Sequence, residues 1–356
     1  MDWNTMKVWL RSTSVVLLLT AAAACGNDAT GPGSDDPFDP EQVNADLAAV
    51  ELAITANADL EADMVHVTAA LDAIPTASLV FEPSDLSALS ALSVQSPLVR
   101  PVRTAPLALN GASQPLIPAD LLGKTFEWDA VEGAYVATER TGAPAAGVRF
   151  ILYDRTQAPP VENGFLDLTD ESNASADRLN VHVEKNGVTR LDYDIVVTET
   201  TNGVTISVAG FLTDGTSQVD FEVLEGVTET ADGFRLDVSY SLSLAGQSLS
   251  VGVDYVIDFG TTSSVEFVAT FVNGPNTLVL DLSQQGAGDI AGTVEWNGDL
   301  VMTVTDDGNG QPTFLGPDGE ELTAAEAAAI EEMFELSFSG LGLLQAYLVF
   351  LFGGVT

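Results

Sequence analysis

Apolar and polar residues alternate along most of the segment from Lys124 to about Asp307. Successive side chains of a β-strand point to opposite faces, so this period predicts strands with one buried face and one solvated face. The clearest runs are Leu191 to Val197, Phe234 to Leu244, Leu249 to Phe259, Val265 to Phe271 and Leu278 to Leu282.

Turn signals separate these runs. Asn-Gly or Asp-Gly dipeptides begin at Asn186, Asn202, Asp214, Asp232, Asn273 and Asn297. These residues tolerate the positive φ angles that tight hairpins require. We therefore expect residues 124–310 to form an antiparallel up-and-down meander of about a dozen strands.

The apolar face of such a sheet has to be buried, since burial is worth about 25 cal/mol per Å². The sheet can close into a barrel, or helices can cover it. Helical segments flank the sheet region on both sides. The expected fold class is mainly β: a large curved antiparallel sheet, either an open half-barrel or a nearly closed barrel, packed on N- and C-terminal helices. The strands of a membrane-spanning barrel also alternate between apolar and polar residues. The short turns and the helical C-terminal segment of this sequence disfavour such a barrel.

Residues 41–75 form the first helical segment. They are rich in alanine, and their apolar residues recur at helical spacing with one change of phase, which predicts one long helix or a helix pair. Asp39 is the expected N-cap, with Pro40 at the first helical position. Residues 76–123 contain six prolines and many serines, so we expect an irregular connector.

Residues 311–356 are expected to contain a hairpin and an apolar helical segment. Thr323 and Glu326 have the spacing of a capping box, which predicts a helix from Ala324. The run from Phe338 to Phe352 is almost wholly apolar. A helix that is apolar all round has to be buried in protein or in lipid.

Residues 1–24 have the parts of a secretory signal peptide: the positive charges of Lys7 and Arg11, then a short apolar core. That core is too short to span a membrane, which takes about 20 apolar residues. The alanines at 22–24 stand directly before Cys25, and this pattern resembles the lipobox of bacterial lipoproteins. The resemblance implies that the leader is removed and that the Cys25 sulfur carries a diacylglyceryl group. An ordinary signal peptide that ends near a cysteine is the alternative.

Residues 25–40 are rich in Gly, Pro, Asp and Ser, as in a flexible tether. Cys25 is the only cysteine of the chain, so it has no disulfide partner. Gly26 rather than an aspartate follows it, which by analogy with lipoprotein sorting in two-membrane bacteria favours the outer membrane. We expect an exported protein, lipid-anchored to the cell envelope on its periplasmic or surface face.

The formal net charge is −40, from 52 acidic and 12 basic residues. Removal of the leader takes away one acidic and two basic residues, which leaves 51 and 10, or −41. The electrostatic field of this negative charge repels nucleic acid and anionic lipid head groups. The expected membrane contact is therefore the lipid on Cys25, and no nucleic-acid partner is expected. Apolar residues make up 46% of the chain, enough for a sizeable core.

Few residues could support histidine or cysteine chemistry. The two histidines, His66 and His182, have no second histidine at metal-ligand spacing. His182 alternates with Val181 and Val183, which places it on the polar face of a strand. No nucleophile elbow, phosphate loop or dinucleotide-binding glycine pattern occurs. We therefore expect a non-enzymatic protein with no catalytic residues and no cofactor.

Carboxylate pairs are abundant. Asp192 and Asp194 share the polar side of one strand, and Asp254 and Asp258 share that of another. Glycosidases need two carboxylates across a cleft, but nothing in the sequence selects one pair. A solvated sheet surface is the simpler interpretation, and a carboxylate-dependent enzyme acting on glycans is the alternative.

One acidic loop could hold a cation. Oxygen-rich side chains gather at Asp306, Asp307 and Asn309, and Asp318 follows. Calcium favours such loops. However, Pro312 stands where a calcium loop starting at Asp307 needs glycine, and the glutamate at its last position is missing. We therefore expect these residues to form turns around a hairpin at Phe314, and a weak calcium site is the alternative.

Aromatic residues are dense at 126–135 and 147–153. Such side chains can grip a sugar or a lipid tail, but they more often pack at the edge of a core. We expect these aromatic residues to pack at the edge of the core.

The predicted architecture resembles the half-barrel lipoprotein carriers, such as the Lol-type carrier and the mycobacterial lipid-transport lipoproteins. The resemblance is one of pattern and assigns no residues. It implies an envelope-anchored lipoprotein whose curved sheet holds a lipid or another hydrophobic ligand. The alternative is a passive surface scaffold or adhesion module in which the helices fill the groove.

Overall fold

The computed structural model describes residues 37–73, 116–154, 156–157, 159–286, 290–306, 312–345 and 347–348. All of them belong to one compact unit, Asp35–Thr356. The strands are β1 (Lys124–Asp129), β2 (Ala134–Thr138), β3 (Gly147–Asp154), β4 (Val161–Asp170), β5 (Asp177–Lys185), β6 (Val188–Thr200), β7 (Gly203–Thr213), β8 (Gln218–Thr230), β9 (Gly233–Leu244), β10 (Leu249–Phe259), β11 (Ser264–Asn273), β12 (Asn276–Gln285), β13 (Ala291–Trp296), β14 (Asp299–Asp306) and β15 (Pro312–Leu315).

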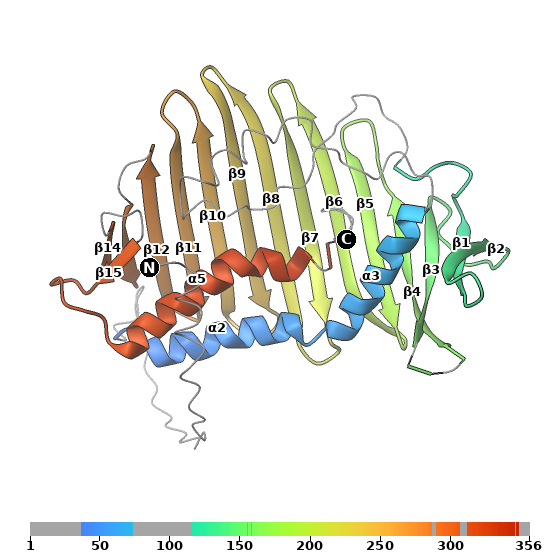
Figure 1. The fold of residues 1–356 in the computed structure, drawn as a ribbon, viewed down its shortest axis with the longest axis horizontal. Coiled ribbons are helices and arrows are strands. Elements are labelled where there is room, and N and C mark those ends of the chain that lie inside the picture. Colours follow the sequence, from blue (N-terminus) through green and yellow to red (C-terminus); the bar gives the residue numbers. More distant parts are fainter. Residues whose placement is uncertain are drawn as a thin grey trace. The chain divides into compact units, whose positions relative to one another are not determined.

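These strands form a single open sheet. Its fifteen strands follow the order β15 to β3 without a crossover, and then β1 and β2 complete the far edge. β15 and β2 are the two edge strands, so the sheet does not close into a barrel (Figure 1). The predicted fold class, a mainly β protein with a large antiparallel sheet and flanking helices, is confirmed.

The sheet departs from the predicted meander in two ways. It has fifteen strands rather than about a dozen, because short strands at both ends extend it. In addition, β1 pairs with β2 antiparallel but with β3 parallel. The segment 139–146 between β2 and β3 is long enough to return across β1, which a two-residue turn is not.

The expected turn dipeptides all lie at hairpins. Asn186 and Asn297 have φ angles of 53° and 54°, and the glycine after each also has a positive φ angle. This is the geometry of a tight two-residue turn. Asp214 and Gly215 begin a four-residue loop between β7 and β8, and at the other three turns the register differs by one residue. Gly203 and Gly233 begin β7 and β9, so the two turn residues precede them. Gly274 is the first turn residue between β11 and β12.

Alternation along the strands separates a buried face from a solvated face. In β10, the side chains of Leu249, Val251, Val253, Tyr255, Ile257 and Phe259 are all at most 8% exposed. The residues between them are half-buried or exposed. The core therefore lies on one side of the sheet, and the opposite side, called the outer face below, meets solvent.

Two short helices follow the N-terminal segment: α2 (Pro40–Thr55) and α3 (Ala58–Ala73). Asp39 is the N-cap of α2, and its Oδ1 accepts a hydrogen bond of 3.1 Å from the Gln42 amide, as the sequence predicted. The predicted change of phase marks the break between the helices. There the buried Asn57 side chain donates a hydrogen bond to the Ala53 carbonyl, which satisfies an acceptor at the end of α2.

The C-terminal helix α5 (Ala324–Gln345) begins at the predicted capping box. The Glu326 carboxylate accepts from the Thr323 amide at 2.8 Å, and the Thr323 hydroxyl accepts from the Glu326 amide at 3.3 Å. α5 packs against α2, and both helices cross the apolar face of the sheet (Figure 1). Residues 349–356 of the predicted apolar segment lie outside the described residues.

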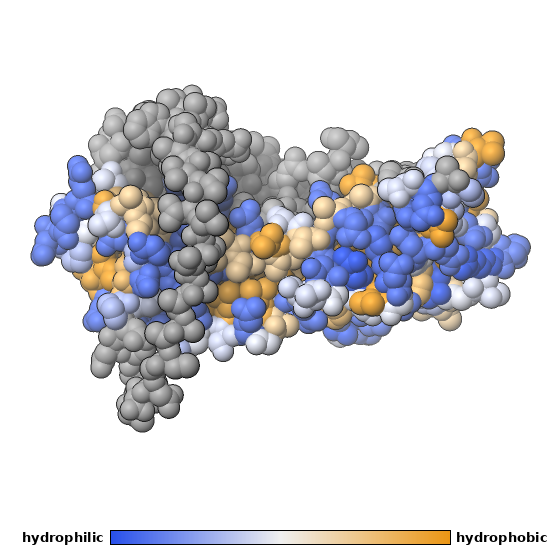
Figure 2. Space-filling model, turned by 90° about the horizontal axis from the view of Figure 1, so that it is seen from below, coloured by the Kyte–Doolittle hydropathy of each residue, from blue (hydrophilic) through white to orange (hydrophobic). Residues whose placement is uncertain are grey.

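Figure 2 shows the side of the molecule that carries the lower ends of the strands. Hydrophilic residues predominate towards its right-hand end, where β1 to β4 lie, and hydrophobic residues gather nearer the middle. On α2, Leu47 is fully buried whereas Leu52 is 68% exposed. The helix therefore presents a buried side and a wet side.

Leu47→Ala is expected to lower the free energy of unfolding by about 2–5 kcal/mol, because it removes a fully buried side chain and leaves a cavity. Leu52→Ala on the same helix is the matched control and should change it by less than about 0.5 kcal/mol. Urea denaturation followed by circular dichroism measures both. Equal effects of the two variants would contradict the packing of α2 on the sheet.

Candidate functional site

The apolar face of the central strands is covered by helices, and we call it the covered face. α2 contacts β7, β8 and β9, and α5 contacts β10 and β11. From α5, the side chains of Ala329, Ile330, Met333 and Leu336 are at most 3% exposed. A face of this kind is a candidate binding surface, because the cover consists of helices and not of a second hydrogen-bonded sheet.

Tyrosine hydroxyls fix α5 and its C-terminal extension on the covered face. Tyr240 of β9 donates hydrogen bonds to the carbonyls of Leu336 and Ser337. Burial raises the pKa of Tyr240 well above its ordinary value, so the hydroxyl remains a donor. Gly340 lies over the same ring: a Cβ there would stand 3.2 Å from the Tyr240 hydroxyl oxygen. The glycine therefore allows the helix to approach the sheet closely.

A second pair of hydroxyls joins the end of the described chain to both layers. Tyr193 of β6 donates to the Tyr347 carbonyl at 3.1 Å, and Tyr347 donates to the Ile54 carbonyl of α2 at 3.2 Å. Each buried hydroxyl thus has a partner, which avoids the cost of an unsatisfied polar group. Together these contacts link β6, α2 and the segment after α5.

Charged residues fix the junction of α2 and α3, close to these hydroxyl contacts. Lys185, only 6% exposed, lies 2.9 Å from an Asp59 oxygen and 2.6 Å from an Asp63 oxygen. Arg190 donates to Asp59 and to the amide oxygen of Asn57. We call these five residues the corner cluster.

Ion pairing dominates the electrostatics of the corner cluster. Burial alone would lower the pKa of Lys185, but the hydrogen bonds to Asp63 and Asp59 raise it above its ordinary value. Burial likewise would raise the pKa of Asp59, but Lys185 and Arg190 lower it. The cluster is therefore ionised around neutral pH, and it clamps the helix pair to the β5–β6 hairpin.

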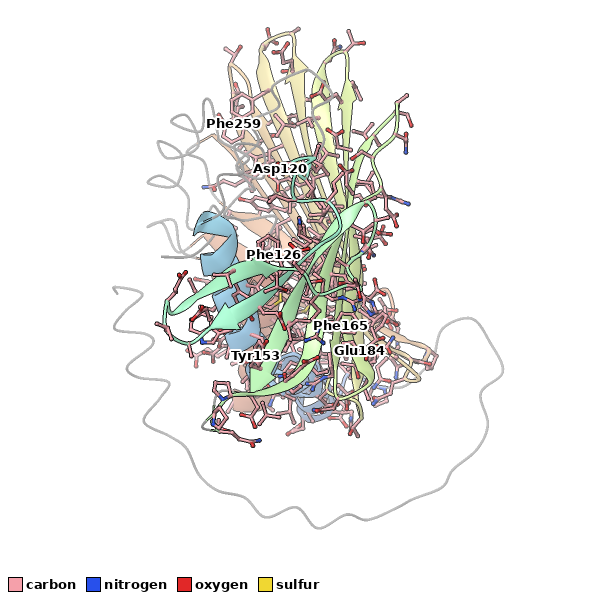
Figure 3. All side chains as sticks on the ribbon, turned by 90° about the vertical axis from the view of Figure 1, so that its right-hand side faces the viewer. Asp120, Phe126, Tyr153, Phe165, Glu184 and Phe259 are labelled. Atoms are coloured by element: carbon pink, nitrogen blue, oxygen red, sulfur yellow. The ribbon has the colours of Figure 1, made fainter. Side chains whose placement is uncertain are left out.

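On the outer face, His182 lies where alternation predicted it. Its Nδ1 is 3.0 Å from an Asp192 oxygen, and Asn180 donates to both Asp192 and Asp194. The Phe165 ring lies beside the imidazole and under the Arg149 guanidinium, and Arg149 pairs with Asp167. Figure 3 shows Phe165 and Glu184 on this outer side and Phe126 on the opposite, core side. The arrangement is a hydrogen-bonded polar surface, as expected for the aspartate pair.

The other predicted site residues are not brought together. Asp254 is exposed, and Asp258 lies 3.8 Å from Arg235. Asp318 is exposed in the turn after β15, whereas the side chain of Asp306 and all of Asp307 and Asn309 lie outside the described residues. In the part of the chain that the structure describes, no group of three or more His, Cys, Asp or Glu residues could hold a metal ion.

Two further predicted positions remain untested. Cys25, the expected lipidation site, lies outside the described residues. The backbone of His66 belongs to α3, but its side chain is not described. Within the described ranges, no helix has the length and apolar character that crossing a membrane requires.

The aromatic segments form the core edge that the sequence favoured. The rings of Phe126 and Phe150 stack with centroids 4.9 Å apart, and both residues are buried. Tyr135 packs edge-on against Phe150 and donates a hydrogen bond of 2.8 Å to the Ile151 carbonyl. These side chains are used in packing the β1–β3 end of the sheet.

Sequence reasoning missed the corner cluster and the tyrosine anchors, although a signal for each was present. Lys185 continues the buried phase of Val181 and Val183, so a lysine on the apolar face should have prompted a search for acidic partners. Tyr193 and Tyr240 also occupy buried positions, and a buried hydroxyl needs an acceptor.

Comparisons of the chain with protein-family models, with curated proteins and with solved structures found no match.

Lys185→Met is expected to lower the free energy of unfolding by about 3 kcal/mol, because it leaves the Asp63 carboxylate without its buried cation. Arg178→Met is the control: its pair with Glu171 is 3.9 Å long and exposed, so the loss should be below about 1 kcal/mol. Chemical denaturation checks both. Adding Asp63→Leu to Lys185→Met should restore part of the loss, and a further loss would argue against the clamp.

Proposed function

We propose that the protein is an envelope-anchored, non-enzymatic lipoprotein that binds a lipid or another hydrophobic ligand on the covered face. The observation that carries the proposal is the cover itself. An open sheet with one apolar face is closed by helices, and the described polar links from β9 and β6 to α5 and its extension are the hydroxyls of Tyr240 and Tyr193.

The energetics favour exchange of the cover for a ligand. Apolar side chains of α5 and a lipid tail bury the same strand residues, so replacing one by the other changes the buried apolar area little. Displacing a second sheet would instead break a ladder of backbone hydrogen bonds. In this proposal the helices cover the apolar face until a ligand displaces them.

A passive scaffold is the second candidate, and one observation favours it. Leu344, Tyr347 and Leu348 at the end of the helical layer are at most 2% exposed, like the strand residues beneath. Interiors packed to this degree are typical of permanent cores. In that case the outer face would be the working surface, as in an adhesion module.

Lipid on Cys25 would provide the attachment to the envelope. Residues 25–40 would act as the tether, and the net charge of −40 argues against a second, electrostatic attachment to anionic lipid. Gly26 favours the outer membrane by analogy with known sorting. The same charge argues against nucleic acid as a partner.

Gentle purification of the Cys25→Ser chain followed by native mass spectrometry tests ligand binding. We expect additional masses in the range of a lipid, which disappear after extraction with detergent. A bare chain under mild conditions would contradict the carrier and favour the scaffold. Deletion of residues 337–356 separates the two candidates further. Loss of a cover leaves the β circular-dichroism signal intact, whereas loss of a core element unfolds the chain.

Cys25→Ala is expected to abolish incorporation of radiolabelled palmitate and to move the protein from the membrane fraction to the soluble exported fraction. The reason is that no other cysteine can take the lipid. Asn27→Ala, two residues away in the tether, is the control and should label normally. Undiminished labelling of the Cys25→Ala chain would contradict lipid attachment at this residue.

A further inference from the structure

The corner cluster places a lysine amine between two carboxyl groups. Lys185 ends β5 in the buried phase of that strand, and its side chain is only 6% exposed. Its Nζ lies 2.6 Å from Asp63 Oδ2 and 2.9 Å from Asp59 Oδ2. The two aspartates stand four residues apart on α3, so both side chains leave the same side of that helix (Figure 1). An amine in contact with two carboxyl groups has the components needed to form an amide bond.

The two carboxyl groups differ in their surroundings. The Asp63 side chain is 15% exposed and its Oδ2 atom is shielded from solvent, whereas the Asp59 side chain is 53% exposed. Exclusion of water protects a reactive centre from hydrolysis. Asp63 also lies closer to the amine. Asp63 is therefore the better acyl group, and Asp59 is better placed to exchange protons with solvent.

Arg190 orients Asp59 towards the amine. Its guanidinium donates to Asp59 Oδ1 at 3.2 Å, while Asp59 Oδ2 faces Lys185. The guanidinium is held in turn by the Asn57 side-chain oxygen at 3.1 Å and by the Thr213 carbonyl at 2.6 Å. A nucleophile, a base within hydrogen-bond reach and a third group that orients the base form the usual arrangement around an activated nucleophile. The corner cluster contains all three.

We propose that Lys185 and Asp63 join in an amide bond, which the folded chain forms by itself with Asp59 as the proton carrier. The ion pair is the starting state. Asp59 takes a proton from the Lys185 ammonium, and the lone pair of the neutral Nζ attacks the carboxyl carbon of Asp63. The N–C bond forms, one C–O bond breaks, and the oxygen leaves with the bonding electrons. Two protons pass in all from the nitrogen to that oxygen, so the products are a neutral amide and one water molecule.

The fold supplies two conditions that free side chains in water lack. Holding the reacting groups in contact gives an effective concentration of about 10⁵–10⁸ M in well-oriented cases. Burial removes hydration from both charges, which brings the neutral amine and acid closer in free energy to the ion pair. Because the hydrogen bonds to both aspartates raise the pKa of Lys185, the neutral amine is a minor species. Bond formation should therefore follow folding slowly.

The bond would be a covalent crosslink of a chain that cannot form a disulfide within itself, since Cys25 is its only cysteine. It would tie α3 to β5 and close the loop of residues 63–185. Closing a long loop lowers the entropy of the unfolded chain, as a disulfide does. The inference requires no ligand, so it stands or falls independently of the proposed function.

Mass spectrometry of the purified, folded Cys25→Ser chain tests the bond. We expect a mass one water molecule below that of its amino acids, and a tryptic product in which the peptide ending at Arg103 is joined to residues 179–190. Trypsin should leave Lys185 uncut, because its amine is no longer free. Lys124→Arg changes the only other lysine after residue 24 and should keep both signatures.

Three variants separate the roles in the reaction. Lys185→Arg keeps the positive charge without the amine, so it should keep its full mass. Asp59→Ala should slow bond formation by about 100-fold or more after a pulse of synthesis, because positioned proton transfer contributes that much. Glu61→Ala, at an exposed position of the same helix, should react like the parent. Circular dichroism shows whether each variant is folded.

Four outcomes would overturn the proposal. The folded parent could keep its full mass after prolonged incubation, or lose water without yielding the joined peptide. Fragmentation of the joined peptide could place the bond at Asp59 instead of Asp63. An Asp59→Ala chain that reacts at the rate of the parent would remove the proton carrier. All four leave the lipid-binding test by native mass spectrometry unaffected.

Discussion

Burial of one face of an open sheet is the constraint on which the rest of this structure depends. Every long strand carries apolar side chains at alternate positions, so the apolar face runs across the whole sheet. The sheet has two free edges, and it cannot bury that face by closing. The chain solves the problem with helices: α5 has 22 residues, and at 1.5 Å per residue it is about 33 Å long. That length crosses several strands spaced about 4.8 Å apart.

Apolar packing alone would leave the helices free to slide, since it has no direction. Directional contacts at two places define their position. At the corner cluster, Lys185 and Arg190 hold the junction of α2 and α3 through short ion pairs. Next to this cluster and along the covered face, the Tyr193 and Tyr240 hydroxyls donate hydrogen bonds to carbonyls of α5 and of the segment after it. α5 also packs along α2, where Val50 and Met333 are fully buried.

Much of the fold could be predicted from local pattern. The period of two predicted the strands and their buried side, and the caps at Asp39 and Thr323 predicted where α2 and α5 begin. Closure of the sheet could not be predicted, because it depends on strand tilt and stagger, which leave no mark on alternation. The parallel contact of β1 with β3 was also missed. It joins residues that are not neighbours in the chain, and neither local propensity nor spacing encodes such a contact.

The charge distribution of the sequence also affects the helical cover. No lysine or arginine follows Arg235, yet acidic residues continue as far as Glu335 in α5. In this half of the molecule, a carboxylate brought to an interface cannot be neutralised by a cation from the same half. It has to remain solvated, as on the outer face, or keep its proton to a higher pH. Burial and the charges of Glu51, Glu335 and Glu331 raise the pKa of Glu332 in this way, to about 7. The acidic composition, which at first argues only against nucleic acid as a partner, therefore also affects the protonation of a half-buried carboxyl group on α5.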